Sequence, residues 1–195
     1  EEDAAKLYSA IKQMLTHSQA FGGGLFALAA SVVADLIHHD PLIYKTLNDA
    51  GLPDAFLDSI CRRGIVPQIE AVAIVPTTLG ALCLNADGIA KVQQSRALEA
   101  LIPVFTTRTY LRTLQGDQSA SLGTSLDELL RHSPQLRPIG VEVFLKILRR
   151  LSILGGRPNA EFEQSLRDAA ADVPSAPGGG GGGGDATATT TAAGE

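Results

Sequence analysis

The sequence predicts an all-α protein, an armadillo- or HEAT-like α-solenoid wound as a right-handed superhelix, on three observations. Apolar residues recur at steps of three and four positions along successive segments, which is the spacing of buried helical faces. Hydrophobic residues make up 45% of the 195 residues and aromatic residues 5%, so the core must be aliphatic, and period-two runs typical of a β-sandwich are missing. Six apolar positions also match at an offset of 46 residues, within the roughly 40–47 residues of HEAT and armadillo units.

The first half of the chain is predicted to form four helices. The apolar positions of the first two are Leu7, Ile11, Met14 and Leu15, and then Phe26, Ala29, Val33, Leu36 and Ile37. We interpret the triple glycine at 22–24 as a flexible joint, because a phosphate-binding loop needs a preceding strand and a following Lys-Ser/Thr pair. Asp40 is predicted to cap the third helix, with Pro41 at its first position, and Gly51 to end it. The fourth helix begins at Pro53 and ends at 62–64.

The segment 70–105 is predicted to contain a long apolar helix, a turn at 85–88 and two shorter helices. Pro76 removes one helical hydrogen bond and should kink or split the first of them. A shift of 46 residues pairs this segment with the preceding one: Val33 with Leu79, Leu36 with Leu82, Ile37 with Cys83, Ile43 with Ile89, Leu52 with Leu98, and Phe56 with Ile102. The segment 70–105 is therefore interpreted as the second copy of a repeat unit.

The segment from about 106 to 137 is predicted to be a polar insert that breaks the repeat. Its expected loop residues are Gly116, Asp117, Ser119, Ser121 and Gly123. A short helix should follow, with Ser125 and Glu128 as a capping box and Leu126, Leu129 and Leu130 facing inward. Because stacked helices would hold such an excursion in place, it could carry a binding surface.

The last part of the chain combines a long helix with a tract of low complexity. The helix begins at Pro138, has apolar residues at helical spacing and stops at 155–156. These apolar residues are Val141, Phe144, Leu145, Leu148 and Leu151. A weaker helix is predicted around Phe162 and Leu166. We thus expect a helical domain at 1–172 and a disordered linker at 173–195, which holds seven consecutive glycines and an Ala/Thr tract.

Composition and charge argue against several classes of protein. A net charge of −5 argues against a nucleic-acid-binding protein, whose affinity depends on clustered positive charge. Two cysteines give neither a disulfide-dense pattern nor a paired zinc-ligand spacing. The longest uncharged stretch, 71–86, is short for a membrane span, and no signal peptide opens the chain. We expect a soluble protein of the cytoplasm, the nucleus or both, with no cofactor, metal or small-molecule ligand.

The first residue is Glu1 rather than Met, so we expect the chain to be a piece of a longer polypeptide.

The histidines and cysteines of the chain offer no assembled metal or catalytic site. Adjacent His38 and His39 point in different directions on a helix, and a metal needs three or four converging ligands, so we interpret them with Asp40 as a solvated helix end. Cys83 lies on an apolar stripe and should be a buried structural thiol. Cys61, beside two arginines, is the more reactive of the two but is also expected to be core.

Four residues make the predicted insert slightly basic and are candidates for partner binding: Arg108, Arg112, Arg131 and His132. They could form a patch for an acidic partner. The alternative is that they form salt bridges with acidic residues of the solenoid. Asp127 and Glu128 are neighbours in sequence and cannot face each other across a substrate, so we interpret them as helix-start charges.

Several motifs then occur in a definite order: SVVADLIHHDP with AGLPDAFLDSI, ALCLNADGI, TTRTYLRTLQGD and SLDELLRH. With them, residues 23–155 resemble part of the N-terminal armadillo-like region of the very large HECT-type ubiquitin-protein ligases, the plant UPL and animal HUWE type. This resemblance implies a non-catalytic solenoid segment that helps to shape a platform for substrates. The family's catalytic cysteine belongs to a distant C-terminal HECT domain that nothing here matches, so neither Cys61 nor Cys83 inherits that role.

The leading hypothesis is therefore a solenoid segment of a HECT-type ligase that binds protein substrates or adaptors while another domain transfers ubiquitin. The alternative is a stand-alone armadillo-type adaptor, which should show a ladder of Asn and Trp side chains along one concave face. The chain contains no Trp and fits this alternative less well. A third hypothesis, a small helical enzyme, would require an activity of this segment by itself, and we expect none.

Overall fold

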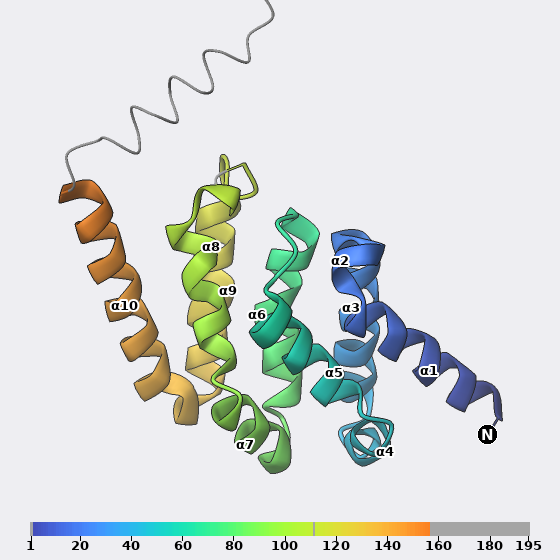
Figure 1. The fold of residues 1–195 in the computed structure, drawn as a ribbon. Helices are drawn as coiled ribbons and strands as arrows, with labels where there is room; N and C mark the ends of the chain where they lie inside the picture. The colour runs from blue at the N-terminus through green and yellow to red at the C-terminus, as the bar shows by residue number, and fades with distance from the viewer. Residues whose placement is uncertain (1, 111, 157–195) are drawn as a thin grey trace, which may run out of the picture. The chain divides into compact units, whose positions relative to one another are not determined.

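The computed structural model describes residues 2–110 and 112–156, and the regular elements of this part of the chain are all helices (Figure 1). The longer ones are α1 (Glu2–Thr16), α3 (Gly23–His39), α6 (Ile69–Leu82), α9 (Gln118–His132) and α10 (Arg137–Gly156). The shorter ones are α2 (Ser18–Phe21), α4 (Ile43–Asp49), α5 (Leu52–Asp58), the π-helix η1 (Ser59–Arg63), α7 (Ala86–Gln94), the 3₁₀-helix η2 (Ala97–Leu101), α8 (Ile102–Thr106), and the 3₁₀-helices η3 (Arg108–Tyr110) and η4 (Pro134–Leu136). The predicted all-α class is confirmed.

The predicted helix around Phe162 and Leu166, the domain end at 172 and the linker at 173–195 all lie outside the described residues.

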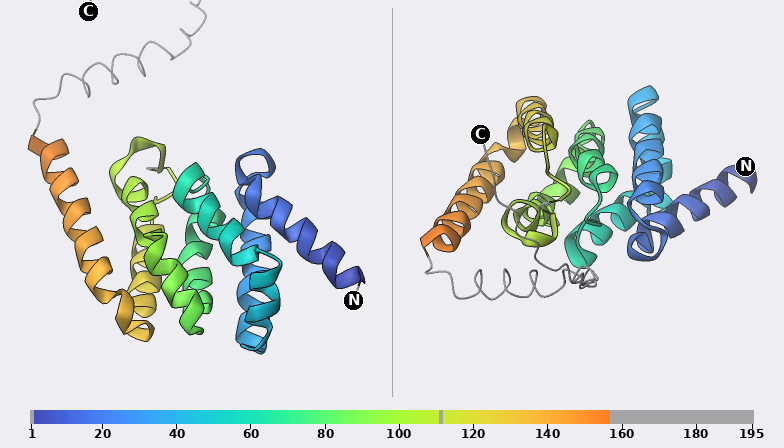
Figure 2. Two further views of the ribbon diagram at one scale, coloured as in Figure 1. Left: turned by 60° about the horizontal axis from the view of Figure 1, so that its bottom comes forward. Right: turned by 90° about the horizontal axis from the view of Figure 1, so that it is seen from above.

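The described helices are arranged in two rows (Figures 1 and 2). One row contains α3, α6 and α9, and α6 contacts both of the others. The second row runs from α1 to α5 with η1, then to η2 with α8, and then to α10. The short helices α4 and α7 connect the rows. This arrangement is consistent with an α-solenoid.

A single aliphatic core lies between the two rows and extends from Ile11 in α1 to Ile147 in α10. Its largest ring contact is between Phe26 and Phe56, which are stacked with centroids 5.9 Å apart and join α3 to α5. All twelve positions paired by the 46-residue offset are buried or partly buried, and Val33 and Leu79 are completely buried. The predicted apolar periodicity therefore identified the inner faces of α3, α5, α6 and α8.

One of the two predicted ends of α4 is confirmed. Gly51 adopts φ +74° and ψ 25°, the left-handed conformation expected of a helix stop, between α4 and α5. Asp40 is not the N-cap of α4, which is Leu42; its Oδ1 accepts a hydrogen bond from the Leu42 N–H at 3.0 Å and stabilises the turn that leads into the helix. The regular helix begins only at Ile43, so Pro41 and Leu42 form a turn ahead of α4 and not its first turn.

The structure corrects four predictions. Pro76 lies inside α6, which continues without being split. The flexible joint expected at 22–24 is wrong, because α3 already begins at Gly23 and the short helix α2 ends at Phe21. Ser119, Ser121 and Gly123 lie within α9 and not in a loop, because α9 begins at Gln118. The capping box is also wrong, because Ser125 is internal to α9 and its hydroxyl donates to the Ser121 carbonyl at 3.2 Å.

Candidate partner-binding surfaces

The four basic candidates of the sequence do not form one patch. Arg108 lies in η3 and Arg112 in the turn that precedes α9, whereas Arg131 and His132 lie in the last turn of α9. A helix of 15 residues separates the two pairs by about 20 Å. All four side chains are exposed, so each pair is accessible, but a single acidic ligand of small size cannot contact both.

The two pairs also differ in their surroundings. Arg131 forms an ion pair with Asp127 one helical turn earlier, so it takes the salt-bridge alternative. Arg112 lines a shallow groove together with Glu70, Gln115 and Gln118. The carboxylate of Glu70 reduces the positive character of this groove.

A larger open groove of about 810 Å³ runs along the second row, between α1, α5 with η1, and α7. Its charged lining consists of Lys12, Asp54, Asp58, Arg62 and Lys91. Lys91 pairs with Asp54 across the groove at 2.5 Å, and Arg62 pairs with Asp58 at 2.8 Å. Both signs of charge are thus present, together with the side chains of Gln94 and Ser95, and the groove suits an extended polar peptide better than a purely acidic ligand.

Neither cysteine is activated as a nucleophile. Cys83 is buried, and desolvation raises the pKa of its thiol. Cys61 is exposed at the edge of the large groove, and partial desolvation is the largest cause that raises the pKa of its thiol. Since the thiolate is the reactive form, a raised pKa makes both residues poorer nucleophiles near neutral pH. The expectation that Cys83 is a buried structural thiol is confirmed, whereas Cys61 is not a core residue.

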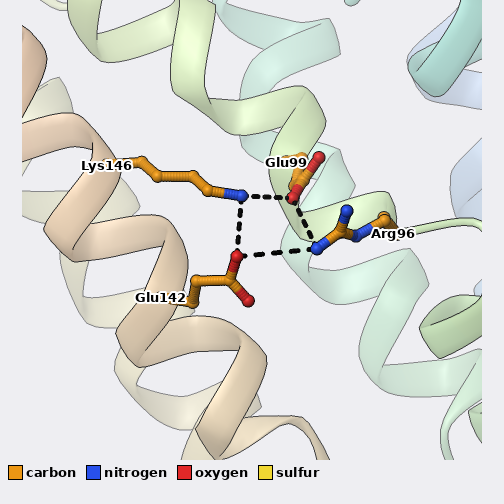
Figure 3. Close-up of polar contacts among 4 residues, drawn as sticks. All are labelled: Arg96, Glu99, Glu142 and Lys146. Carbon is orange, nitrogen blue, oxygen red and sulfur yellow. Dashed lines mark hydrogen bonds and ion pairs between the residues drawn. The ribbon is translucent and has the colours of Figure 1, made fainter.

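A closed ring of four charged residues ties α10 to η2 (Figure 3). Lys146 donates to Glu99 and to Glu142 at 2.8 Å each, and Arg96 lies 3.3 Å from Glu99 and 3.5 Å from Glu142. The hydrogen bond from Lys146 lowers the pKa of Glu142, and the hydrogen bond to Glu142 raises the pKa of Lys146. The ring was not predicted from the sequence. The separation of 47 residues between Glu99 and Lys146 is a signal that could have indicated it, because it is close to the repeat offset.

The five apolar residues whose spacing predicted α10 are not the ones that face the core. The face of α10 that packs against the rest of the molecule contains Gly140, Val143 and Ile147. Val141, Phe144, Leu145, Leu148 and Leu151 instead form an exposed apolar stripe, called the α10 stripe below, in which each residue is between 43% and 62% exposed. The spacing of these five residues was helical, but spacing alone does not tell which apolar sector is covered.

The predicted helix end at residues 38–40 is the place where the sequence offers candidate metal ligands. His38, His39 and Asp40 are all exposed at the end of α3, as expected of a solvated helix end. Across residues 2–110 and 112–156, no three His, Cys, Asp or Glu side chains are grouped so that they could hold a metal ion. In the same ranges, no helix has both the length and the apolar character needed to cross a membrane.

Comparison with known proteins identifies relatives of the chain. The model of the family described as Domain of Unknown Function (DUF913) matches residues 2–190. The chain is 44% identical over 156 residues to the E3 ubiquitin-protein ligase UPL1 of Arabidopsis thaliana. This match covers 80% of this chain and 4% of UPL1. It is 31% identical over 151 residues to the E3 ubiquitin-protein ligase ptr1 of Schizosaccharomyces pombe, with 77% and 5% covered. It is 29% identical over 160 residues to the E3 ubiquitin-protein ligase HUWE1 of Mus musculus, with 78% and 4% covered.

These matches confirm the resemblance that the motifs indicated, and they show that the chain spans only about 4–5% of the length of these relatives. The chain belongs to the DUF913 family and is homologous to a short region of large HECT-type E3 ubiquitin-protein ligases.

Proposed function

We propose that this chain is a non-catalytic scaffold segment of a HECT-type E3 ubiquitin-protein ligase. It is an armadillo-like α-solenoid that binds protein substrates or adaptors, while another domain of the same polypeptide transfers ubiquitin. The cytoplasm, the nucleus or both are the proposed location, which imaging of the tagged full-length protein would test.

The observation that carries the proposal is the recurrence of contacts after about 46 residues. The Thr78 hydroxyl reaches the Ala30 carbonyl at 3.5 Å, 48 residues away. The Tyr110 hydroxyl donates to the Ile65 carbonyl at 2.5 Å, 45 residues away, and Lys146 donates to Glu99 across 47 residues. Each contact joins one unit to the next at nearly the same sequence separation. Stacked repeats that contact only their neighbours have this property.

The chemistry of the thiols supports a non-catalytic role. Transfer of ubiquitin through a thioester requires a thiolate that is accessible to a bulky protein substrate. Cys83 is buried, and the pKa values of both Cys61 and Cys83 are raised by desolvation. A scaffold role needs no such group.

The large groove along α1, α5 and α7 supports a role in binding. It is open, carries both signs of charge and is lined by helices that pack on the core, so the helices that present its polar groups are held in place before a partner arrives. Arg62 on η1 and Lys91 on α7 both lie in it and belong to two successive units. A peptide segment lying along this groove would contact both units.

The test uses charge reversal of the groove in a full-length ligase that contains this segment. Arg62→Glu with Lys91→Glu should reduce modification of the ligase's protein substrates, while formation of the ubiquitin thioester on the ligase remains at the wild-type level. Lys45→Glu, an exposed lysine on α4 outside the groove, is the matched control and should change neither. Equal loss of thioester and substrate modification would contradict a binding role.

A second experiment tests the non-catalytic part of the proposal. The chain 1–195, mixed with ubiquitin and its activating and conjugating enzymes, should form no reducible ubiquitin adduct. An adduct that disappears in Cys61→Ser or in Cys83→Ser would overturn the proposal.

A further inference from the structure

The last described helix is apolar around much more of its circumference than its contacts require. A helix that packs on one side needs an apolar sector of about 100°. In α10 that sector is supplied by Gly140, Val143 and Ile147, which pack against α8 and α9. The α10 stripe (Val141, Phe144, Leu145, Leu148 and Leu151) adds a second sector of similar width beside the first. Two apolar sectors on one helix indicate two packing partners.

The inner helices show that this exposure is not a general property of the molecule. Within residues 2–110 and 112–156, α5, α6, α8 and α9 contain no large hydrophobic side chain that is exposed. Exposed ones occur in α1, α2 and α3 at the other end of the stack, at the turn residues Leu42 and Leu84, and most densely in α10. Exposed apolar surface of this extent marks an interaction site.

Charges around the stripe indicate which kind of partner fits. Glu142 and Lys146 lie on the side of α10 that faces η2 and are used in the four-residue ring (Figure 3). Arg149 and Arg150 are exposed near the end of the helix and form no ion pair with any described residue. By the helical rotation of 100° per residue, Arg149 borders the stripe next to Leu145. A partner helix with acidic residues along its edge would complement this border.

The order of the second row indicates where such a helix comes from. Along this row each helix is covered by the next one in the chain: α1 by α5, η1 by η2, and η2 with α8 by α10. The stripe lies beside these contacts on α10, and its residue Phe144 also lines a small apolar pocket together with Leu98 and Val143. The relatives are about twenty to twenty-five times as long as the stretch they share with this chain, since that stretch is 4–5% of their length.

We infer that the α10 stripe is the contact surface for one amphipathic helix, aliphatic on one face and acidic along its edge, from the following repeat of the parent ligase. This inference rests on the proposed function, because it treats the chain as part of a longer solenoid. Burial of five large apolar side chains would give this junction most of its free energy. The contact of Arg149 with an acidic residue would set its register.

The test measures binding of the chain 1–195 to a defined probe. The probe is the stretch of about 50 residues, roughly one repeat, that follows the matched region in UPL1 of Arabidopsis thaliana. Leu145→Glu with Leu148→Glu should weaken binding by at least about tenfold, because each charge would be buried against the probe. Arg149→Glu should weaken it less, and more so at low salt than at high salt.

Two controls keep the test decisive. Leu28→Glu with Leu42→Glu changes two exposed leucines outside α10 and should leave binding unchanged. Circular dichroism should show that the Leu145→Glu, Leu148→Glu chain keeps its helices, since both side chains are already exposed. Absence of probe binding, or binding that the α10 variant does not weaken, would overturn the inference.

Sedimentation of the chain alone adds a further outcome. If the wild-type chain forms dimers that Leu145→Glu with Leu148→Glu dissociates, the stripe binds a second copy and the inference is wrong. The groove variants and the ubiquitin-adduct assay do not involve α10. If they behave as proposed while the probe fails to bind, only the inference about the stripe fails.

Discussion

The helices α6 and α10 are both rich in aliphatic residues but differ in their surroundings. α6 lies between α3 and α9, and its large apolar residues Val72, Val75, Leu79 and Leu82 are completely buried. α10 contacts α8, η2 and α9 on one side, and seven of its large apolar residues are exposed, the five of the α10 stripe together with Ile153 and Leu154. Among the described residues, α6 is thus covered on two sides and α10 on one, so apolar content alone does not tell how many neighbours a helix in such a stack has.

The largest expected effect on stability comes from comparing a leucine-to-alanine substitution in α6 with one in α10. Leu79→Ala should reduce the free energy of unfolding by about 2–5 kcal/mol, because a completely buried leucine leaves a cavity between α3 and α6. Leu148→Ala, at a position 62% exposed, should change it by no more than about 0.5 kcal/mol. Chemical denaturation of the two variants and the wild type measures both values. Similar losses would mean that α10 is packed on both sides within this chain.

The next largest expected effect concerns the close contact between the end of α6 and the start of α7. A Cβ atom at Gly88 in α7 would lie 1.9 Å from the Leu82 carbonyl oxygen, so the start of α7 can approach the end of α6 only without a side chain. Gly88→Ala should therefore cost about 1–3 kcal/mol. Gly123→Ala in α9 is the matched control, because a Cβ there meets no neighbouring atom within 4 Å. It should raise stability by up to about 1 kcal/mol, since alanine favours a helix more than glycine does.

Alkaline titration tests how burial of the Tyr44 phenol in α4 contributes to folding stability. Burial, and then the nearby charge of Asp87, raises the pKa of Tyr44 in α4 to about 12. In the unfolded chain the phenol ionises near pH 10, so the unfolded state loses its proton first and folding stability falls between about pH 10 and pH 12. The part of this loss due to Tyr44 should be on the order of 2–3 kcal/mol.

Tyr44→Phe isolates that contribution. The Tyr44 hydroxyl is buried and has no hydrogen-bond partner among the described residues, so the variant should be nearly as stable as the wild type at pH 7. Above pH 10 it should lose less stability than the wild type. Parallel stability curves for the two proteins from pH 7 to pH 12 would show that Tyr44 ionises normally in the folded state.

Much of the fold could be predicted from the sequence because local pattern and tertiary packing agree there. The positions Val33 and Leu79, matched at 46 residues, are both completely buried, and Gly51 has the left-handed conformation expected of it. The start of α9 could not be predicted in this way. Ser119, Ser121 and Gly123 have low helix propensity, but Leu122 and Leu126 in the same stretch are buried, and α9 packs on α6. Tertiary packing overrides propensity in that segment.

The candidate surfaces were harder to predict than the fold. The sequence grouped Arg108 and Arg112 with Arg131 because they are close along the chain, whereas α9 places them at opposite ends. It offered a salt bridge as the alternative for Arg131, and Asp127 provides it. The exposed sector of α10 could not be recognised, because apolar periodicity gives the direction of each side chain but not which neighbour is present.

The smallest expected effect concerns the ion-pair ring that holds α10 against η2. Lys146→Gln removes the group shared by Glu99 and Glu142, and it should lower stability less than Leu79→Ala or Gly88→Ala, because all four side chains are between 30% and 58% exposed to water. The coupling between Lys146→Gln and Glu99→Gln in a double-mutant cycle should shrink as salt is raised from low concentration to 1 M. The cavity left by Leu79→Ala should respond to salt much less. If the coupling persisted undiminished in 1 M salt, the ring would be shielded from solvent, and α10 would be held at its inner side as firmly as α6 is.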